Sequence, residues 1–255
     1  YRLGAAWEAA GRPEAAAAAY AKAVADHRSP VARETGIAFF HHRHGRPAHA
    51  ARALGMRLQE GSSPEWFFRL GKAQERCFAW EEAAEAYRKA VAASPGRLFW
   101  WHRLGTVCER LERWEEAAEA HDRSLTGGNR RRPSWQYRLG VARARQGRYP
   151  EACEAFFLAL PATRRRVDLP AELAGRSAKD LARWLARDAR SAALWRALGL
   201  AHEQEGAWEQ AATAHAEAMA RDHRQPPVGF YLLGRARARA GDFKGACQAL
   251  ANLYP

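Results

Sequence analysis

The dipeptide Leu-Gly, or a close substitute, recurs along this chain with a period near 34 residues. Successive spacings between the pairs are 34, 33, 34, 35, 59 and 35 residues. A period of this length indicates stacked supersecondary units, each of which buries its apolar face only against a neighbour. The pairs are Leu3-Gly4, Ile37-Ala38, Leu70-Gly71, Leu104-Gly105, Leu139-Gly140, Leu198-Gly199 and Leu233-Gly234.

Each unit is predicted to contain two helices. In the third unit, apolar residues at helical spacing predict a first helix over about 64–78 and a second over about 81–93. Trp80, Trp114 and Trp208 are expected at the starts of second helices, wedged between helices. No stretch alternates as a strand would, so the chain is predicted to be almost entirely helical.

This pattern resembles the tetratricopeptide repeat family. The third unit supplies the family's residues as Phe67, Leu70-Gly71, Ala83, Tyr87, Ala90 and Pro95, and the fifth supplies Leu139-Gly140, Gly147, Tyr149, Ala152, Phe156 and Ala159. The resemblance implies an all-α, right-handed superhelical solenoid of about six to seven helix pairs with one irregular insertion. It also implies that the first helices line a concave groove that binds a partner segment.

Departures from the pattern suggest how the chain is divided. His121 and His215 replace the aromatic residue of the second helix, and the 59-residue interval holds about 25 extra residues that include Pro161 and Pro170. We expect repeats one to four and most of five over 1–160, with Leu-Gly registers at 3, 37, 70, 104 and 139. An irregular insertion or degenerate helix, seen as a kink or an extra helix, is expected over 161–190, and two C-terminal repeats over 191–255.

Arginine dominates the charge of the chain. Its 255 residues include 41 basic and 28 acidic side chains, for a net charge of +13, and only five of the basic residues are lysine. Codon bias acting on a solvated surface explains such a composition, but arginine is also the better residue for recognising carboxylates and phosphates. No apolar run of about 18 residues is present, so no membrane-spanning segment is predicted.

Some of these arginines recur in register with the repeat. One set stands just before the leucine of each pair, and another stands five residues after the glycine, so that the two sets share a helix face. Repulsion between charges about 10 Å apart in water is only ~0.4 kcal/mol, so the pattern does not require a ligand. The predicted partner-binding residues are Arg43, Arg69, Arg76, Arg103, Arg110, Arg138, Arg145 and Arg239.

No motif in the sequence points to catalysis, a cofactor or a metal. The cluster His41, His42, His44 and His49 has no cysteine or carboxylate at ligand spacing, so solvated or half-buried histidines are expected. No two cysteines form a Cys-x-x-Cys pair, which favours buried thiols in a reduced cytosolic compartment. Cys77 and Cys108 are expected in first helices, and Cys153 and Cys247 in second helices.

The leading hypothesis is a non-catalytic, cytoplasmic protein-interaction scaffold whose arginine-rich groove binds an acidic partner segment. The phrases Phe99-Trp100-Trp101 and Arg113-Trp114-Glu115 also resemble, more loosely, the Trp-rich repeats of bacterial capsule and teichoic-acid polymerases of the CDP-glycerol glycerophosphotransferase type. That resemblance implies an accessory region at the inner face of the membrane, contacting anionic polymer or organising the enzyme, with a catalytic domain outside this segment. The chain begins at Tyr1, and we expect it to be part of something longer. Nucleic acid is less favoured because no reading element is recognisable.

Overall fold

The computed structural model describes residues 48, 64–127, 132–160, 167, 169–222, 224 and 226–253. Across these ranges the regular elements are helices, and no strand is present. None of the helices described is long and apolar enough to cross a membrane. The fold class predicted from the sequence, all-α with helices arranged in pairs, is confirmed for this part of the chain.

The chain divides into two compact units, residues 1–113 and 114–255. The described helices of the first unit are α5 (Pro64–Arg76), α6 (Trp80–Ala93) and α7 (Leu98–Arg110). Those of the second are α8 (Trp114–Ser124), α9 (Pro133–Arg145), α10 (Tyr149–Ala159), α11 (Ala178–Leu185), α12 (Ala192–Gln204), α13 (Trp208–Arg221), α14 (Pro227–Arg239) and α15 (Phe243–Leu250), followed by the 3-10 turn η3 (Ala251–Leu253).

The glycine of each Leu-Gly pair lies where the two helices of a repeat approach most closely. A Cβ atom on Gly71 would come within 2.7 Å of the Tyr87 ring, and one on Gly199 within 2.4 Å of the His215 ring. Such distances are shorter than van der Waals contact, so any side chain would push the two helices apart. The same close approach brings Gly140 against Phe156 and Gly234 against Leu250.

The turn inside each repeat needs a left-handed backbone seven residues after that glycine. Gly147, Gly206 and Gly241 supply it with φ values of 77°, 74° and 87°. Phe78 and Glu112 occupy the equivalent places with φ values of 60° and 56°. Because a side chain in this region costs roughly 1 kcal/mol or more, these two turns are strained relative to the glycine turns.

The core of the first unit is aromatic. Phe68 of α5 stacks on Trp100 of α7 with ring centroids 5.0 Å apart, and it lies 5.5 Å from the ring of Tyr87 on α6. All three side chains are buried. Helix α6 therefore packs against α5 within its repeat and against α7 of the next repeat. Cys77, expected inside a first helix, instead lies one residue beyond the end of α5, because the turn to α6 begins there.

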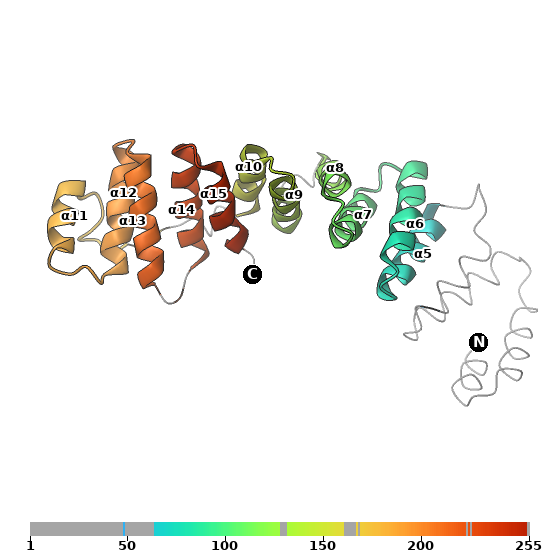
Figure 1. The fold of residues 1–255 in the computed structure, drawn as a ribbon, viewed down its shortest axis with the longest axis horizontal. Helices are drawn as coiled ribbons and strands as arrows, with labels where there is room; N and C mark the ends of the chain where they lie inside the picture. Colours follow the sequence, from blue (N-terminus) through green and yellow to red (C-terminus); the bar gives the residue numbers. More distant parts are fainter. Residues whose placement is uncertain are drawn as a thin grey trace, which may run out of the picture. The chain divides into compact units, whose positions relative to one another are not determined.

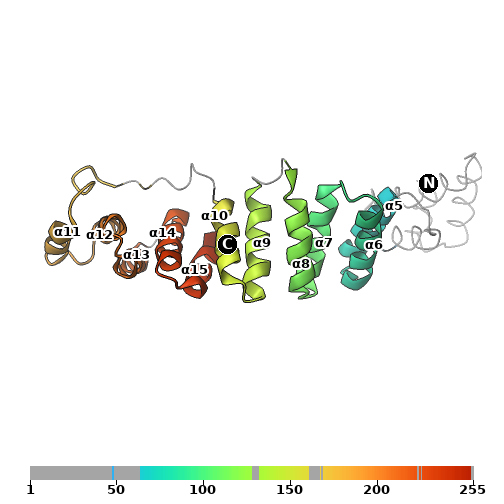
Figure 2. The ribbon, with the colours of Figure 1, turned by 90° about the horizontal axis from the view of Figure 1, so that it is seen from above.

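In the second unit the order of helices in space departs from their order in sequence. Helices α8, α9 and α10 stack in succession, and α11 to α15 form a second run in which each packs on the next (Figure 1). The last helix, α15, packs against α10, whereas α11 lies at the far end of this second run (Figure 2). After α10 the chain therefore passes to α11 and returns, so that α14 and α15 fill the place beside α10.

Helix α11 lies within the segment 161–190 and has its own small core. Leu181 and Leu185 of α11 are buried together with Leu194 and Leu198 of α12. The Ser177 hydroxyl caps α11 by accepting a hydrogen bond from the backbone N–H of Asp180. An extra helix was one of the two forms expected for this segment, but the return of the chain onto α10 was not expected.

Candidate functional site

Four of the predicted partner-binding arginines lie at the ends of first helices. They are the last residues of α5, α7, α9 and α14, and all four side chains are exposed. Among the residues that the structure describes, none of the four pairs with a carboxylate. A cation in the last turn of a helix also interacts favourably with the helix dipole. We call these residues the helix-end arginines: Arg76, Arg110, Arg145 and Arg239.

Two helix-end arginines lie over tryptophan rings. The Cζ atom of Arg145 is 5.3 Å from the centroid of Trp114, and that of Arg239 is 5.8 Å from Trp208. Each tryptophan is the first residue of the second helix in the preceding repeat, as predicted, and each is half-buried. The tryptophan face attracts the guanidinium group and limits its motion, while the edge of the group stays in solvent.

The arginines that precede the leucines have different surroundings. Arg69 pairs with Glu65 one turn earlier, with 3.4 Å between Nε and Oε1, and lies over the Trp66 ring. Arg103 is half-buried and pairs with Glu75 of the previous repeat. Arg138 is also half-buried. Arg43 and the four clustered histidines His41, His42, His44 and His49 lie outside the described residues.

Glu75 is the centre of a polar network between two repeats. The buried Tyr87 hydroxyl donates a hydrogen bond to Glu75 Oε2 at 2.8 Å, and Arg103 pairs with the same oxygen. Burial raises the pKa of Tyr87, and the nearby carboxylate raises it further. Burial opposes the charge of Arg103, but Glu75 and Tyr87 together outweigh this effect, so that the pKa of Arg103 is also raised. The network therefore holds a neutral phenol and a charged pair.

Glu203 forms the same network in the second unit. His215, in the place of Tyr87, lies 3.2 Å from Glu203 through Nε2 and Oε1, and Arg235 of the next repeat pairs with the other carboxylate oxygen. Burial would raise the pKa of Glu203, but His215 and Arg235 lower it overall. Neither Glu75 nor Glu203 is among the residues predicted from the sequence to bind a partner. The missed signal was their spacing, since each stands twelve residues before the tyrosine or histidine that it meets.

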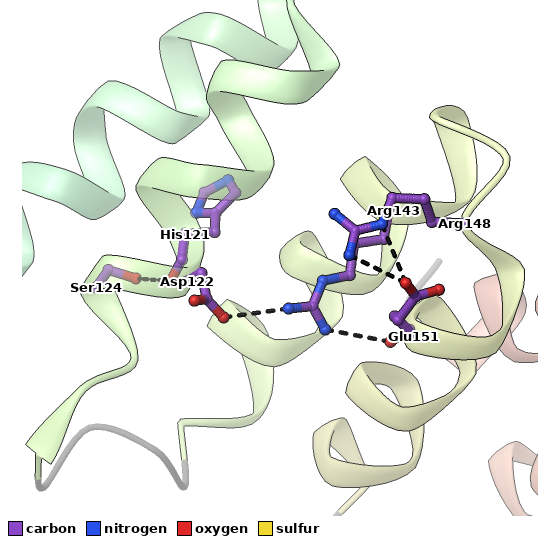
Figure 3. Close-up of polar contacts among 6 residues, drawn as sticks. All are labelled: His121, Asp122, Ser124, Arg143, Arg148 and Glu151. Atoms are coloured by element: carbon purple, nitrogen blue, oxygen red, sulfur yellow. Dashed lines mark hydrogen bonds and ion pairs between the residues drawn. The ribbon is translucent and has the colours of Figure 1, made fainter.

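A further polar cluster links α8, α9 and α10 (Figure 3). Arg143 Nη2 lies 3.2 Å from Asp122 Oδ1, and its other terminal nitrogen donates to the Glu151 carbonyl at 3.4 Å. Arg148 donates to the Glu151 carboxylate at 3.0 Å. A cavity of about 610 Å³ lies beside this cluster, lined by Asp122, Gln136, Arg143 and Glu154 together with Leu125, Leu139 and Leu158. Because Asp122 already neutralises Arg143, this cavity does not favour an anion.

The residues that could bind a metal do not gather. Within the ranges that the structure describes, no group of three or more histidine, cysteine, aspartate or glutamate side chains could hold a metal ion. Cys108, Cys153 and Cys247 are buried thiols, and Cys77 is half-buried.

Comparison with known proteins identifies the repeats. Two tetratricopeptide repeat family models match the chain, one at residues 80–130 and 102–165 and the other at 193–227. Residues 80–165 and 193–227 are therefore similar to tetratricopeptide repeats, a class of module that is typically a non-catalytic scaffold for protein–protein interaction. No curated protein sequence matches this chain.

Solved structures of MamA are similar to this protein. One, "MamA MSR-1 C2", is 20% identical, with 75% of this chain and 95% of that chain covered and a TM-score of 0.46. Another, MamA 41-end from Desulfovibrio magneticus RS-1, is 17% identical, with 75% and 94% covered and a TM-score of 0.47.

Proposed function

We propose that this chain is a non-catalytic protein-interaction scaffold whose helix-end arginines bind an acidic partner segment. One observation carries the proposal. Arg103, Arg143 and Arg235 are satisfied by carboxylates inside the fold, whereas the helix-end set is exposed and has no carboxylate partner among the described residues. A guanidinium group that pairs with no carboxylate of its own chain is available to a carboxylate from outside.

The spacing of these arginines by repeat suits an extended ligand. Within the first unit, Arg76 and Arg110 end the first helices of neighbouring repeats. An exposed contact of this kind contributes only ~0.2–1 kcal/mol, so useful affinity needs several contacts together. The helix-end set supplies the principal contacts, and Arg43 and Arg138 are proposed as flanking residues. Arg69 and Arg103, also predicted from the sequence, already pair with Glu65 and Glu75. The accessory role beside a surface-polymer transferase stays a prediction from the sequence alone.

Binding of a fluorescein-labelled, glutamate-rich peptide tests the proposal. We expect the combined change Arg76→Glu, Arg110→Glu and Arg145→Glu to weaken binding by about tenfold or more, because each reversal replaces an attraction by a repulsion. The matched control is Arg187→Glu, Arg190→Glu and Arg224→Glu, which alters the net charge equally at three other exposed side chains. Equal loss in both variants, each with unchanged circular dichroism, would show that net charge alone attracts the peptide.

A further inference from the structure

The contact between α10 and α15 is built from equivalent residues of two repeats. Residues 137–160 and 231–254 are related by an offset of 94 and share Tyr, Leu-Gly, Ala-Arg-Ala-Arg, Gly and Ala-Cys-x-Ala at the same places. Arg143 donates to the carbonyl of Glu151, and Arg237, its equivalent, donates to the carbonyl of Gly245. The two repeats thus have the same internal contacts as well as the same sequence pattern.

These two repeats meet through reciprocal contacts. The Tyr137 hydroxyl donates to the backbone oxygen of Ala251 at 2.7 Å. Tyr231, the equivalent of Tyr137, packs edge-on against Phe157, the equivalent of Ala251, with ring centroids 5.8 Å apart. In a two-fold interface every contact occurs twice: residue i of the first unit meets residue j of the second, and residue j of the first meets residue i of the second. Here both sides of such an interface lie in one chain.

Two cysteines lie at the centre of this interface. The Sγ atoms of Cys153 on α10 and Cys247 on α15 are 3.3 Å apart, and the residues are 2% and 4% exposed. Their other contacts are reciprocal too, since Cys153 Sγ lies 3.6 Å from the Phe243 carbonyl and Cys247 Sγ lies 3.3 Å from the Tyr149 carbonyl. A disulfide bond needs the two sulfur atoms at about 2.05 Å, so a small movement of either side chain suffices.

We propose that Cys153 and Cys247 form a redox site, and that their oxidation to a disulfide locks α15 onto α10. A peroxide is the oxidant we assign to the step. The disulfide would join two positions that are 94 residues apart in the sequence and lie on either side of the connection from α10 to α11. The return of the chain onto α10 would then be held by a covalent bond as well as by packing.

The reaction balances with hydrogen peroxide as the only co-reactant. The Cys247 thiolate attacks one peroxide oxygen, the O–O bond breaks, and the leaving hydroxide takes up the original thiol proton to become water. The sulfenic acid formed on Cys247 is then attacked by Cys153, so that the S–S bond forms and the S–O bond breaks. The departing hydroxide takes the proton of Cys153 and becomes water. Over the two steps the thiols lose two hydrogen atoms, and one hydrogen peroxide molecule becomes two water molecules.

The paired thiols favour the first of these steps. A hydrogen bond from the Cys153 thiol stabilises the thiolate of Cys247 and lowers its pKa, although burial opposes this. The same hydrogen bond, together with burial, raises the pKa of Cys153, so Cys247 rather than Cys153 is the thiol that ionises first. Helix α15 has eight residues and is followed only by η3 in the described structure, so local opening of this short element admits a small oxidant.

Peptide mapping of the 255-residue chain tests the proposal directly. The protein is reduced, freed of reductant, treated with hydrogen peroxide and digested without reduction. We expect one cross-linked peptide pair that contains Cys153 and Cys247, lighter by two hydrogens and separated again by dithiothreitol. Hydrogen exchange of the α15 amides should slow by roughly tenfold or more in the oxidised chain, because the cross-link removes open states.

Variants define the site. Cys153→Ala and Cys247→Ala should each abolish both effects, whereas Cys108→Ala, which removes another buried thiol, should leave both intact. Sulfinic acid at either cysteine without a cross-link, a disulfide that involves Cys77 or Cys108, or a disulfide between two chains would each overturn the proposal. The mapping uses the unaltered chain, so it decides the question even if a variant fails to fold.

Discussion

Arginine has two distinct roles at the scale of single residues. Arg103 and Arg235 each pair with a half-buried glutamate of the previous repeat, and Arg143 joins Asp122 to the start of α10. Arg76 and Arg110 contact no carboxylate among the described residues. Codon bias can account for the presence of arginine in both groups. Only the arginines that pair with a carboxylate inside the fold have a structural role. The second group is therefore where an external ligand is expected.

Glu203→Gln tests the buried network through its pH dependence. Because His215 and Arg235 hold the pKa of Glu203 below its ordinary value of 4.5, its contribution to stability is fully present above about pH 5 and is lost as pH falls through the folded pKa. We expect the variant to lose about 1–3 kcal/mol of unfolding free energy at pH 7. The difference in unfolding free energy between the variant and the unaltered protein should shrink towards pH 3, and urea denaturation at each pH would measure it.

The control for this change is Glu85→Gln on α6. Glu85 pairs with Lys89 at 2.9 Å, but both side chains are more than half exposed. Solvent screens such an exposed pair and leaves it little effect on stability, so this variant should unfold almost as the unaltered protein does. A Glu203→Gln variant as stable as the control at pH 7 would contradict a structural role for the network.

At the scale of elements, the repeat period predicted helix starts better than helix ends. Trp80, Trp114 and Trp208 do begin second helices, as their recurrence with the repeat predicts. The first helix of the third unit ends at Arg76 rather than near Phe78, since the left-handed turn falls at Phe78 itself. The spacing of apolar residues carries no information about the sign of the backbone angle φ. The apolar pattern therefore could not predict where this helix ends.

Substitutions in the turns test that account of the boundaries. Glu112→Gly should raise the unfolding free energy by up to about 1 kcal/mol, because glycine adopts a positive φ without the steric cost of a Cβ atom. Gly206→Ala, at the equivalent turn between α12 and α13, should lower it by roughly 1–2 kcal/mol. Thermal melts followed by circular dichroism would show the two opposite shifts. A Glu112→Gly variant that is clearly less stable would mean that the glutamate side chain has another role in this turn.

At the scale of the chain, the sequence predicts which helices form but not which repeats are neighbours. Residues 161–177 have no helical period, so nothing in that connection indicates where the following repeats pack. The offset between Leu139-Gly140 and Leu233-Gly234 is the sum of the 59- and 35-residue spacings. That offset, together with the residues that the two repeats share, is the sequence signal of the equivalence between α9–α10 and α14–α15. That two equivalent repeats should pack against each other depends on reciprocal contacts of Tyr137 and Tyr231, which only the structure reveals.

Photo-cross-linking locates the binding surface on which the functional account depends. A glutamate-rich peptide that carries a benzophenone group is bound to the chain, irradiated and mapped by mass spectrometry. The account predicts cross-links at the turns that follow α5, α7, α9 and α14, beside Arg76, Arg110, Arg145 and Arg239, and predicts that raised salt removes them because exposed ion contacts are screened. Salt-resistant cross-links, or cross-links gathered on α11 or in the cavity lined by Asp122 and Glu154, would contradict it.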